Sequence, residues 1–128
     1  MQLIHDRAEG YFFIRAIRAD SVVVIDREFR SSVIVAPDRV VENWSPTQAS
    51  EIDDVAMRTL AELDPEVVII GTGVRQHFPA RRVLHPLLRR GVGVEVMDNS
   101  AAGRTYNLLA AEGRRVVAAF LLAPVPSA

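Results

Sequence analysis

The stretch Val67-Val68-Ile69-Ile70-Gly71-Thr72-Gly73 decides how this chain folds. Four consecutive apolar residues are typical of a short strand that is buried on both faces. The two glycines that follow allow the backbone to turn sharply and to approach another group closely. A strand of this kind sits at the centre of an open sheet, so the rest of the chain is interpreted as what surrounds it.

Downstream of this stretch, helical and strand patterns alternate. We expect a helix at about 80–90, a buried strand at 92–97, a helix at about 101–111 and a strand at 116–122. Two successive strand–helix–strand units predict right-handed crossovers and a parallel core of three strands. Pro86 conflicts with the first helix, because proline lacks the N–H that a helix interior needs. The helix therefore either begins late, near Val83, or is kinked.

Upstream, the pattern is that of a β-layer followed by one helix. Strands are expected at 11–19, 22–25 and 29–35, with a short fourth at 39–44, and the short connections impose antiparallel pairing. Ser50 and Asp53 have the spacing of a capping box that opens a helix, which Asp64-Pro65 ends. The sequence thus predicts a single three-layer α/β domain over residues 1–128. An N-terminal antiparallel β-meander packs on a mixed central sheet with a C-terminal βαβαβ parallel unit and about three helices.

Composition excludes several kinds of chemistry. The chain has 128 residues, 49% of them hydrophobic, and no cysteine, which excludes disulfides, zinc–thiolate sites and cysteine nucleophiles. The first seven residues lack the apolar core of a signal peptide. The late apolar run at 116–123 is far shorter than the about 20 residues of a membrane span. We expect a cytoplasmic protein without membrane insertion.

Charge is unevenly distributed along the chain. All 15 basic residues are arginine. Residues 1–66 contain 7 arginines and 13 acidic residues, whereas residues 67–128 contain 8 arginines and only 3 acidic residues. This asymmetry suits a basic end that attracts anions or an acidic partner, although solvated helix faces produce it equally well. The net charge of −1 disfavours nucleic-acid binding.

Ligands of open parallel sheets bind beyond the carboxyl ends of the strands. Here those ends carry Gly-Thr-Gly and Asp-Asn-Ser, and glycine-rich turns can present amides to a phosphate or carboxylate. The candidate anion site comprises Gly71, Thr72, Gly73, Arg75, Asp98, Thr105, Asn107 and Arg114. A dinucleotide fingerprint fails, because its third glycine is replaced by Gln76 and Pro79 interrupts the helix start.

No catalytic residue, cofactor or metal site is predicted. The three histidines lack ligand spacing, and the acidic residues near Ser50 compensate a helix dipole. Ser100, His77 and Asp98 could be combined into a triad, but Ser100 lacks a nucleophile elbow and is better placed as a helix cap. Asn107 lies in mid-helix, where it needs a hydrogen-bonding partner, so we expect it to tie the last helix to a loop near the strand ends.

Three blocks in order carry a family resemblance. They are Pro65 to Gly73, Gly91 to Asp98, and Thr105-Tyr106-Asn107-Leu108-Leu109 with Glu112-Gly113-Arg114. Together they resemble a small domain-of-unknown-function family that includes the mitochondrial complex I assembly factor 3 proteins and compact bacterial members. The resemblance covers about residues 11–122. It implies a three-layer fold and a non-enzymatic role, and it carries over no catalytic residue.

Two functions are therefore expected. The first is a non-enzymatic binding or assembly-factor-like module with a protein partner, linked to assembly of a respiratory or membrane complex. The alternative is a small-anion or nucleotide-binding protein whose site lies at the carboxyl ends of the parallel strands. A homodimer would cover exposed β-structure, and the sequence leaves the oligomeric state open.

Overall fold

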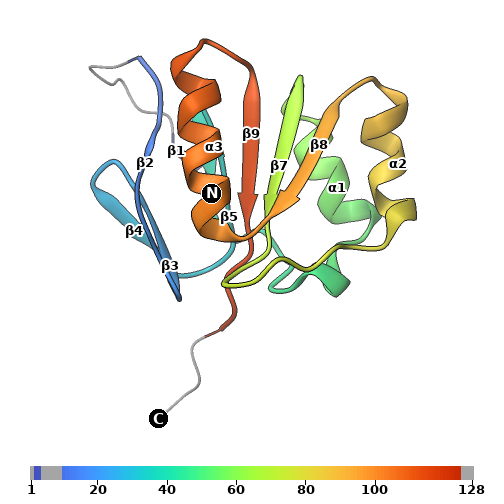
Figure 1. Cartoon of the computed structure of the whole chain (residues 1–128), viewed down its shortest axis with the longest axis horizontal. Coiled ribbons are helices and arrows are strands. Elements are labelled where there is room, and N and C mark those ends of the chain that lie inside the picture. Colours follow the sequence, from blue (N-terminus) through green and yellow to red (C-terminus); the bar gives the residue numbers. More distant parts are fainter. Residues whose placement is uncertain (1, 4–9, 125–128) are drawn as a thin grey trace.

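The computed structural model describes residues 2–3 and 10–124 and confirms an α/β architecture in layers. A mixed sheet lies at the centre, with two helices on one face and, on the other, the last helix beside a small second sheet (Figure 1). His5, most of the first seven residues and the residues after Pro124 lie outside the described part of the chain. No helix in the described part is long and apolar enough to cross a membrane.

The main sheet has the strand order β1-β6-β5-β9-β7-β8. Its strands are β1 (Gln2–Leu3), β5 (Val33–Ala36), β6 (Arg39–Val41), β7 (Val67–Gly71), β8 (Gly93–Met97) and β9 (Val116–Phe120). The stretch that opened the sequence analysis is β7, which pairs in parallel with β8 and β9 and is buried along its whole length. The parallel three-stranded core is therefore confirmed.

The small sheet consists of β2 (Ile14–Arg18), β3 (Ser21–Val24) and β4 (Arg27–Phe29), all antiparallel. The expected single strand at 29–35 is wrong, because the chain leaves the small sheet after Phe29 and joins the main sheet at Val33. Ser32, at the crossing, is buried: its carbonyl accepts a hydrogen bond from Trp44 N at 2.9 Å and its Oγ accepts one from Leu122 N at 3.0 Å. Side-chain alternation continues through this point, so the pattern could not reveal the break.

A 3₁₀ turn, η1 (Ala49–Glu51), precedes the first helix, α1 (Asp54–Ala61). The predicted capping role of Ser50 is wrong, since the N-cap is Asp53, whose Oδ1 accepts a hydrogen bond from Ala56 N at 2.9 Å. The helix starts after the residue that can satisfy its free N–H groups, rather than at the first polar residue of the segment. Trp44 is buried in the core, and its indole N–H donates to the Ala56 carbonyl at 3.2 Å.

The second helix, α2 (Arg81–Arg89), contains Pro86 in its interior and ends before Gly91, whose φ of +77° suits glycine at a helix C-terminus. Of the two alternatives that Pro86 left open, the late start near Val83 is therefore wrong. The third helix, α3 (Asn99–Ala111), has Asp98 as its N-cap, so the capping role expected of Ser100 is wrong. A further correction concerns β8, which was expected to be buried: it is the edge strand of the main sheet and is half exposed.

Two apolar cores separate the layers. The core beneath α1 and α2 contains Met57, Leu60 and Leu87 against β7 and β9. The other core joins α3 to both sheets and contains Tyr106, Phe120 and Phe29. These two cores hold β7 and β9 rigidly, so the loops at the carboxyl ends of the parallel strands start from fixed points.

Candidate functional site

Asn99 joins the carboxyl ends of two strands to the start of α3. Its side chain is only 3% exposed; Oδ1 accepts a hydrogen bond from Gly73 N at 3.1 Å, and Nδ2 donates to the Leu121 carbonyl at 3.0 Å. Its own backbone N–H donates to the Gly73 carbonyl at 2.8 Å. One buried amide thus fixes the segments that follow β7 and β9. Sequence reasoning treated Asn99 only as part of a capping segment and missed this role.

Gly71 is required because Asn99 packs against the end of β7. A Cβ at position 71 would collide with Asn99 Oδ1 and would also lie 3.2 Å from Ala102 Cβ and 3.2 Å from a Phe120 ring carbon. Glycine is needed at position 71 because Asn99 packs so closely against it, and not because of its backbone conformation. Of the two glycines, only Gly73, with φ of +95°, is in the left-handed conformation. The glycine pair thus serves packing first and turning second.

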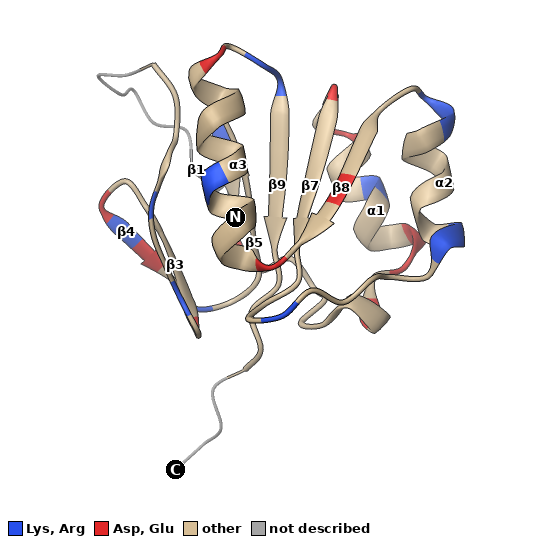
Figure 2. Cartoon of the chain, in the orientation of Figure 1, with Lys and Arg blue, Asp and Glu red and all other residues tan. Residues whose placement is uncertain are grey.

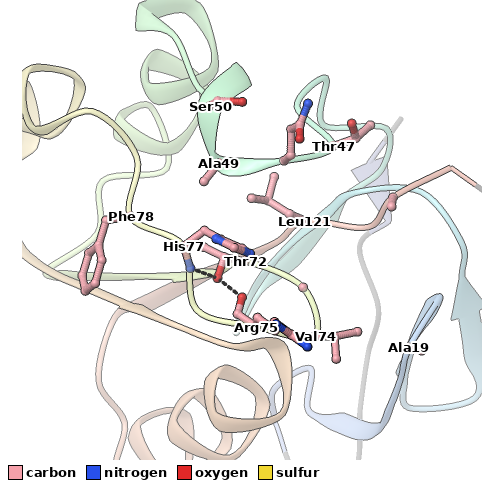
Figure 3. Close-up of a pocket in the computed structure, with 13 residues that line it drawn as sticks. Ala19, Thr47, Ala49, Ser50, Thr72, Val74, Arg75, His77, Phe78 and Leu121 are labelled. Carbon is pink, nitrogen blue, oxygen red and sulfur yellow. Dashed lines mark hydrogen bonds between the residues drawn. The ribbon is translucent and has the colours of Figure 1, made fainter.

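The loop after β7 is held by the hydroxyl of Thr72. Thr72 Oγ1 donates to the Arg75 carbonyl at 2.7 Å and accepts from His77 N at 3.0 Å, as the dashed lines in Figure 3 show. Thr72 N donates to the Met97 carbonyl at 2.9 Å. Because Gly73 N is bound to Asn99, the amides of Thr72 and Gly73 are both used within the fold. An anion at this loop would have to rely on side chains rather than on a cradle of amides.

Gln76, which breaks the dinucleotide fingerprint, has a structural task. Its Nε2 donates to the Val96 carbonyl at 2.8 Å, on the edge strand β8. An unpaired strand edge invites pairing with another chain, and a covering side chain reduces that risk. The residue that rules out a nucleotide loop therefore protects the sheet edge.

A cleft of about 560 Å³ lies beside this loop. Its walls are the segment before η1, the loop after β7 and the chain after β9, with Phe78 near one end and Val74 near the other (Figure 3). These two apolar side chains are 71% and 72% exposed. The segment 47–50, which forms one wall, was not among the residues predicted from sequence.

Two smaller hollows adjoin the cleft and share lining residues with it or with each other. The first, of about 170 Å³, shares Ala19, Gly73 and Val74 with the cleft. The other, of about 310 Å³, lies between β2 and α3 and shares Ile17 and Ser100 with the 170 Å³ hollow. We call the three together the edge groove. Among the described residues, no aspartate or glutamate lines it, although the chain has 16 of them.

The structure brings only some of the predicted site residues together. Gly71, Thr72, Gly73 and Arg75 form or adjoin the loop at the cleft. Asp98 is used as the N-cap of α3, where its Oδ1 accepts from Ala101 N at 2.8 Å. Asp98 is therefore used to hold the start of α3.

The remaining three predicted residues lie elsewhere. Thr105 Oγ1 contacts Met97 Sδ at 3.5 Å. Arg114 pairs with Glu66 at 3.1 Å, at the edge of the sheet where the parallel strands begin, opposite the cleft. The backbone N–H of Arg115 and then the Arg114 guanidinium lower the pKa of Glu66. Arg114 thus belongs to a surface ion pair and cannot contact a ligand at the cleft.

Asn107 has the structural role predicted for it, with a different partner. Its Oδ1 accepts from Ile14 N and its Nδ2 donates to the Ile14 carbonyl, both at 2.8 Å. The side chain thus imitates a neighbouring strand and ties α3 to β2, rather than to a loop near the strand ends. Gly103, one turn earlier, makes room for the side chain of Ile17.

No metal or triad geometry is assembled. Among the described residues, no group of three histidine, aspartate or glutamate side chains is placed to hold an ion. His77 lines the cleft, Ser100 lines the two smaller hollows, and the capping role occupies Asp98. The three residues considered as a triad share no hydrogen bond with one another in the described part of the chain.

Comparison with known proteins assigns the chain to a family. A family model described as a protein of unknown function (DUF498/DUF598) matches residues 14–121. The chain belongs to this family. The DUF498/DUF598 assignment agrees with the three sequence blocks, since all of them fall within the matched residues.

Three DUF498/DUF598-like proteins illustrate the range of relatives. The 13 kDa major membrane protein of Francisella tularensis subsp. holarctica is 26% identical over 122 residues, or 91% of this chain and 95% of that protein. NADH dehydrogenase (ubiquinone) 1 alpha subcomplex assembly factor 3 of Danio rerio is 34% identical over 95 residues, or 73% of this chain and 54% of that protein. A crystal structure from Bordetella parapertussis has 39% identity and a TM-score of 0.83, covering 91% of this chain and 99% of that one.

Proposed function

We propose that this chain is a non-enzymatic protein-binding module that acts like an assembly factor for a respiratory or membrane complex. The edge groove carries this proposal, because it is long, open and flanked by two exposed apolar side chains. The assembly-factor part of the proposal is supported by the relatives of this chain, which include proteins named NADH dehydrogenase (ubiquinone) 1 alpha subcomplex assembly factor 3.

The dimensions of the groove suit an extended polypeptide. Three adjoining hollows lie along the carboxyl edge of the sheet and between β2 and α3. A compact small-molecule site would be one enclosed cavity with converging polar groups. Here the polar groups of the Thr72 loop bind one another, as described above, so they preorganise the wall of the groove instead.

Val74 and Phe78 supply the apolar contacts that such binding needs. Large exposed apolar residues beside a groove are typical of binding sites for protein segments, and buried aromatic anchors contribute most of the affinity of many interfaces. Hydrogen bonds from Thr72 and Asn99 fix the loop after β7, which lowers the conformational entropy that is lost when a partner binds. A partner segment with apolar side chains spaced to meet these two residues fits this arrangement.

Native co-purification of a tagged protein tests the proposal. The double variant Val74→Ser/Phe78→Ser should lose a specific stoichiometric partner, with affinity reduced by at least about 30-fold. Leu108→Ser is the matched control, since Leu108 is 62% exposed on α3 and does not line the groove. The proposal fails if no partner is recovered at any salt concentration, or if the groove variant retains the partner as well as the control does.

A further inference from the structure

The hollow of about 310 Å³ between β2 and α3 presents two arginines from different elements. Arg15 comes from β2 and Arg104 from α3, and Ser100 lies one turn before Arg104 on the same side of the helix. Arg15 sits at a β-bulge: Ile14 faces Val24 and Ala16 faces Val23, so Arg15 is the extra residue on its strand. Bulges redirect side chains and are enriched beside functional sites.

Neither arginine has a partner within the described residues. Arg18, Arg27 and Arg30 form ion pairs with Glu28, with Glu42 directly after β6, and with Asp20 and Glu28. Basic and acidic segments accordingly lie together in the small sheet (Figure 2). The side chains of Arg15 and Arg104, in contrast, form no ion pair and no hydrogen bond with any described residue. No described carboxylate lines their hollow. Within the described residues, the fold therefore places two cations without an ion-pair partner around one depression, where like charges repel.

The walls of this hollow are fixed in advance. Asn107 binds both backbone groups of Ile14, which holds β2 against α3 immediately beside Arg15. Gly103 lets Ile17 pack close to the helix, where an added Cβ would lie 3.0 Å from Ile17 Cγ1. Preorganised walls of this kind allow a ligand to bind without ordering the backbone first.

We infer that the hollow between β2 and α3 binds a phosphate-type oxyanion, held by the guanidinium groups of Arg15 and Arg104 with the Ser100 hydroxyl as a further donor. Guanidinium forks match the geometry of phosphate oxygens, and an anion between two arginines removes their repulsion. The volume of the hollow leaves room for the organic part of a phosphate ester. This hollow is the part of the edge groove between β2 and α3, away from the Thr72 loop, and phosphate binding to it can be tested without any protein partner.

Thermal unfolding in inorganic phosphate, with sodium chloride at equal ionic strength as the reference, tests the inference. Phosphate should raise the melting temperature saturably, by about 4 °C at ten times a dissociation constant of about a millimolar. Amide chemical shifts should change at Arg15, Ser100 and Arg104. An equal effect of both salts, or shift changes confined to other residues, would overturn the inference.

Variants separate the site from general electrostatics. Arg15→Gln and Arg104→Gln should each weaken phosphate binding by about tenfold. In the absence of phosphate, each variant should melt at the same temperature as the native chain or at a higher one, because the repulsion between the two arginines is removed. Arg15→Glu should remove the phosphate response by pairing with Arg104. Arg89→Gln is the control, because Arg89 is exposed, has no ion pair within the described residues and lines no part of this hollow. A response of the control equal to that of Arg15→Gln would contradict the assignment.

Phosphate chemistry can be presented by a soluble ester or by a lipid headgroup. Titration with glycerol phosphate and, separately, with vesicles containing about 30% phosphatidylglycerol distinguishes these sources. Binding of either one that is lost in Arg15→Gln/Arg104→Gln supports the site and names the source. Binding of neither, together with no response to inorganic phosphate, refutes it.

Discussion

Replacing Asn99 by alanine tests the central claim that one buried amide holds the carboxyl edge of the sheet. The variant leaves Gly73 N without its acceptor at 3.1 Å and the buried Leu121 carbonyl without its donor at 3.0 Å. Each lost hydrogen bond is worth about 1 kcal/mol, and an unsatisfied buried group costs about 1–3 kcal/mol. We expect the free energy of unfolding to fall by about 2–4 kcal/mol, a large share of the 5–15 kcal/mol typical of a domain.

Urea unfolding followed by tryptophan fluorescence measures this loss directly. Trp44 is the only tryptophan, and at 5% exposure it reports on burial of the core beneath α1. Ser100→Ala is the control, since Ser100 is the exposed neighbour of Asn99 and its hydroxyl makes no hydrogen bond with any described residue. The control should change the free energy of unfolding by less than about 0.5 kcal/mol.

Asn99→Asp adds a pH dependence whose sign follows from the geometry. The introduced carboxylate can accept from Gly73 N but faces the Leu121 carbonyl, and its burial raises its folded-state pKa. The variant should therefore regain stability relative to the native chain as pH falls through that raised pKa, because the protonated form can donate to Leu121. A loss below about 1 kcal/mol in Asn99→Ala, or an Asn99→Asp penalty that is independent of pH, would refute the reasoning.

Three further outcomes are expected from denaturant unfolding. Asn107→Ala should cost about 1–3 kcal/mol, since both backbone groups of Ile14 lose their partner, and a change below about 0.5 kcal/mol would show that β2 does not need the tie. Pro86→Ala should raise stability by about 1–3 kcal/mol, because the exposed helix interior regains an N–H donor; an unchanged midpoint would contradict this. The Arg115 backbone N–H and the Arg114 guanidinium lower the pKa of Glu66 in the folded state, so its contribution to stability is present at neutral pH and is lost as pH falls through that lowered pKa. Glu66→Gln should flatten this acid dependence, and identical pH profiles of the variant and the native chain would disprove the contribution.

Local patterns were sufficient wherever a residue acts on its own segment. The apolar run at β7 and the glycine at the end of α2 were both recognisable, because strand burial and helix termination depend on neighbours within a few residues. The two strand–helix–strand units predicted the parallel pairing. The layers and the three-stranded parallel core follow from these signals.

Errors arose where partners distant in sequence decide the outcome. Apolar and polar side chains alternate throughout the segment 29–35, which hides the break between the two sheets. The chain leaves the small sheet at this point because Ser32 accepts hydrogen bonds from Trp44 and from Leu122, which is 90 residues away. The valines of 92–97 suggested a buried strand, but the order of the sheet puts β8 at the edge, where Glu95 is exposed. Glu95 was the local sign of an exposed edge, since charged side chains are common on edge strands.

The candidate site shows the same division. The sequence by itself determined that Gly71, Thr72, Gly73 and Arg75 lie at the end of the central strand, because they directly follow it along the chain. Only the tertiary structure decided that the amides of Thr72 and Gly73 are used internally, that Arg114 lies at the far edge, and that Arg15 and Arg104 share a hollow. The reason is physical: hydrogen bonds and charge pairs form between groups that folding brings together, and their separation in sequence carries almost no information about that distance.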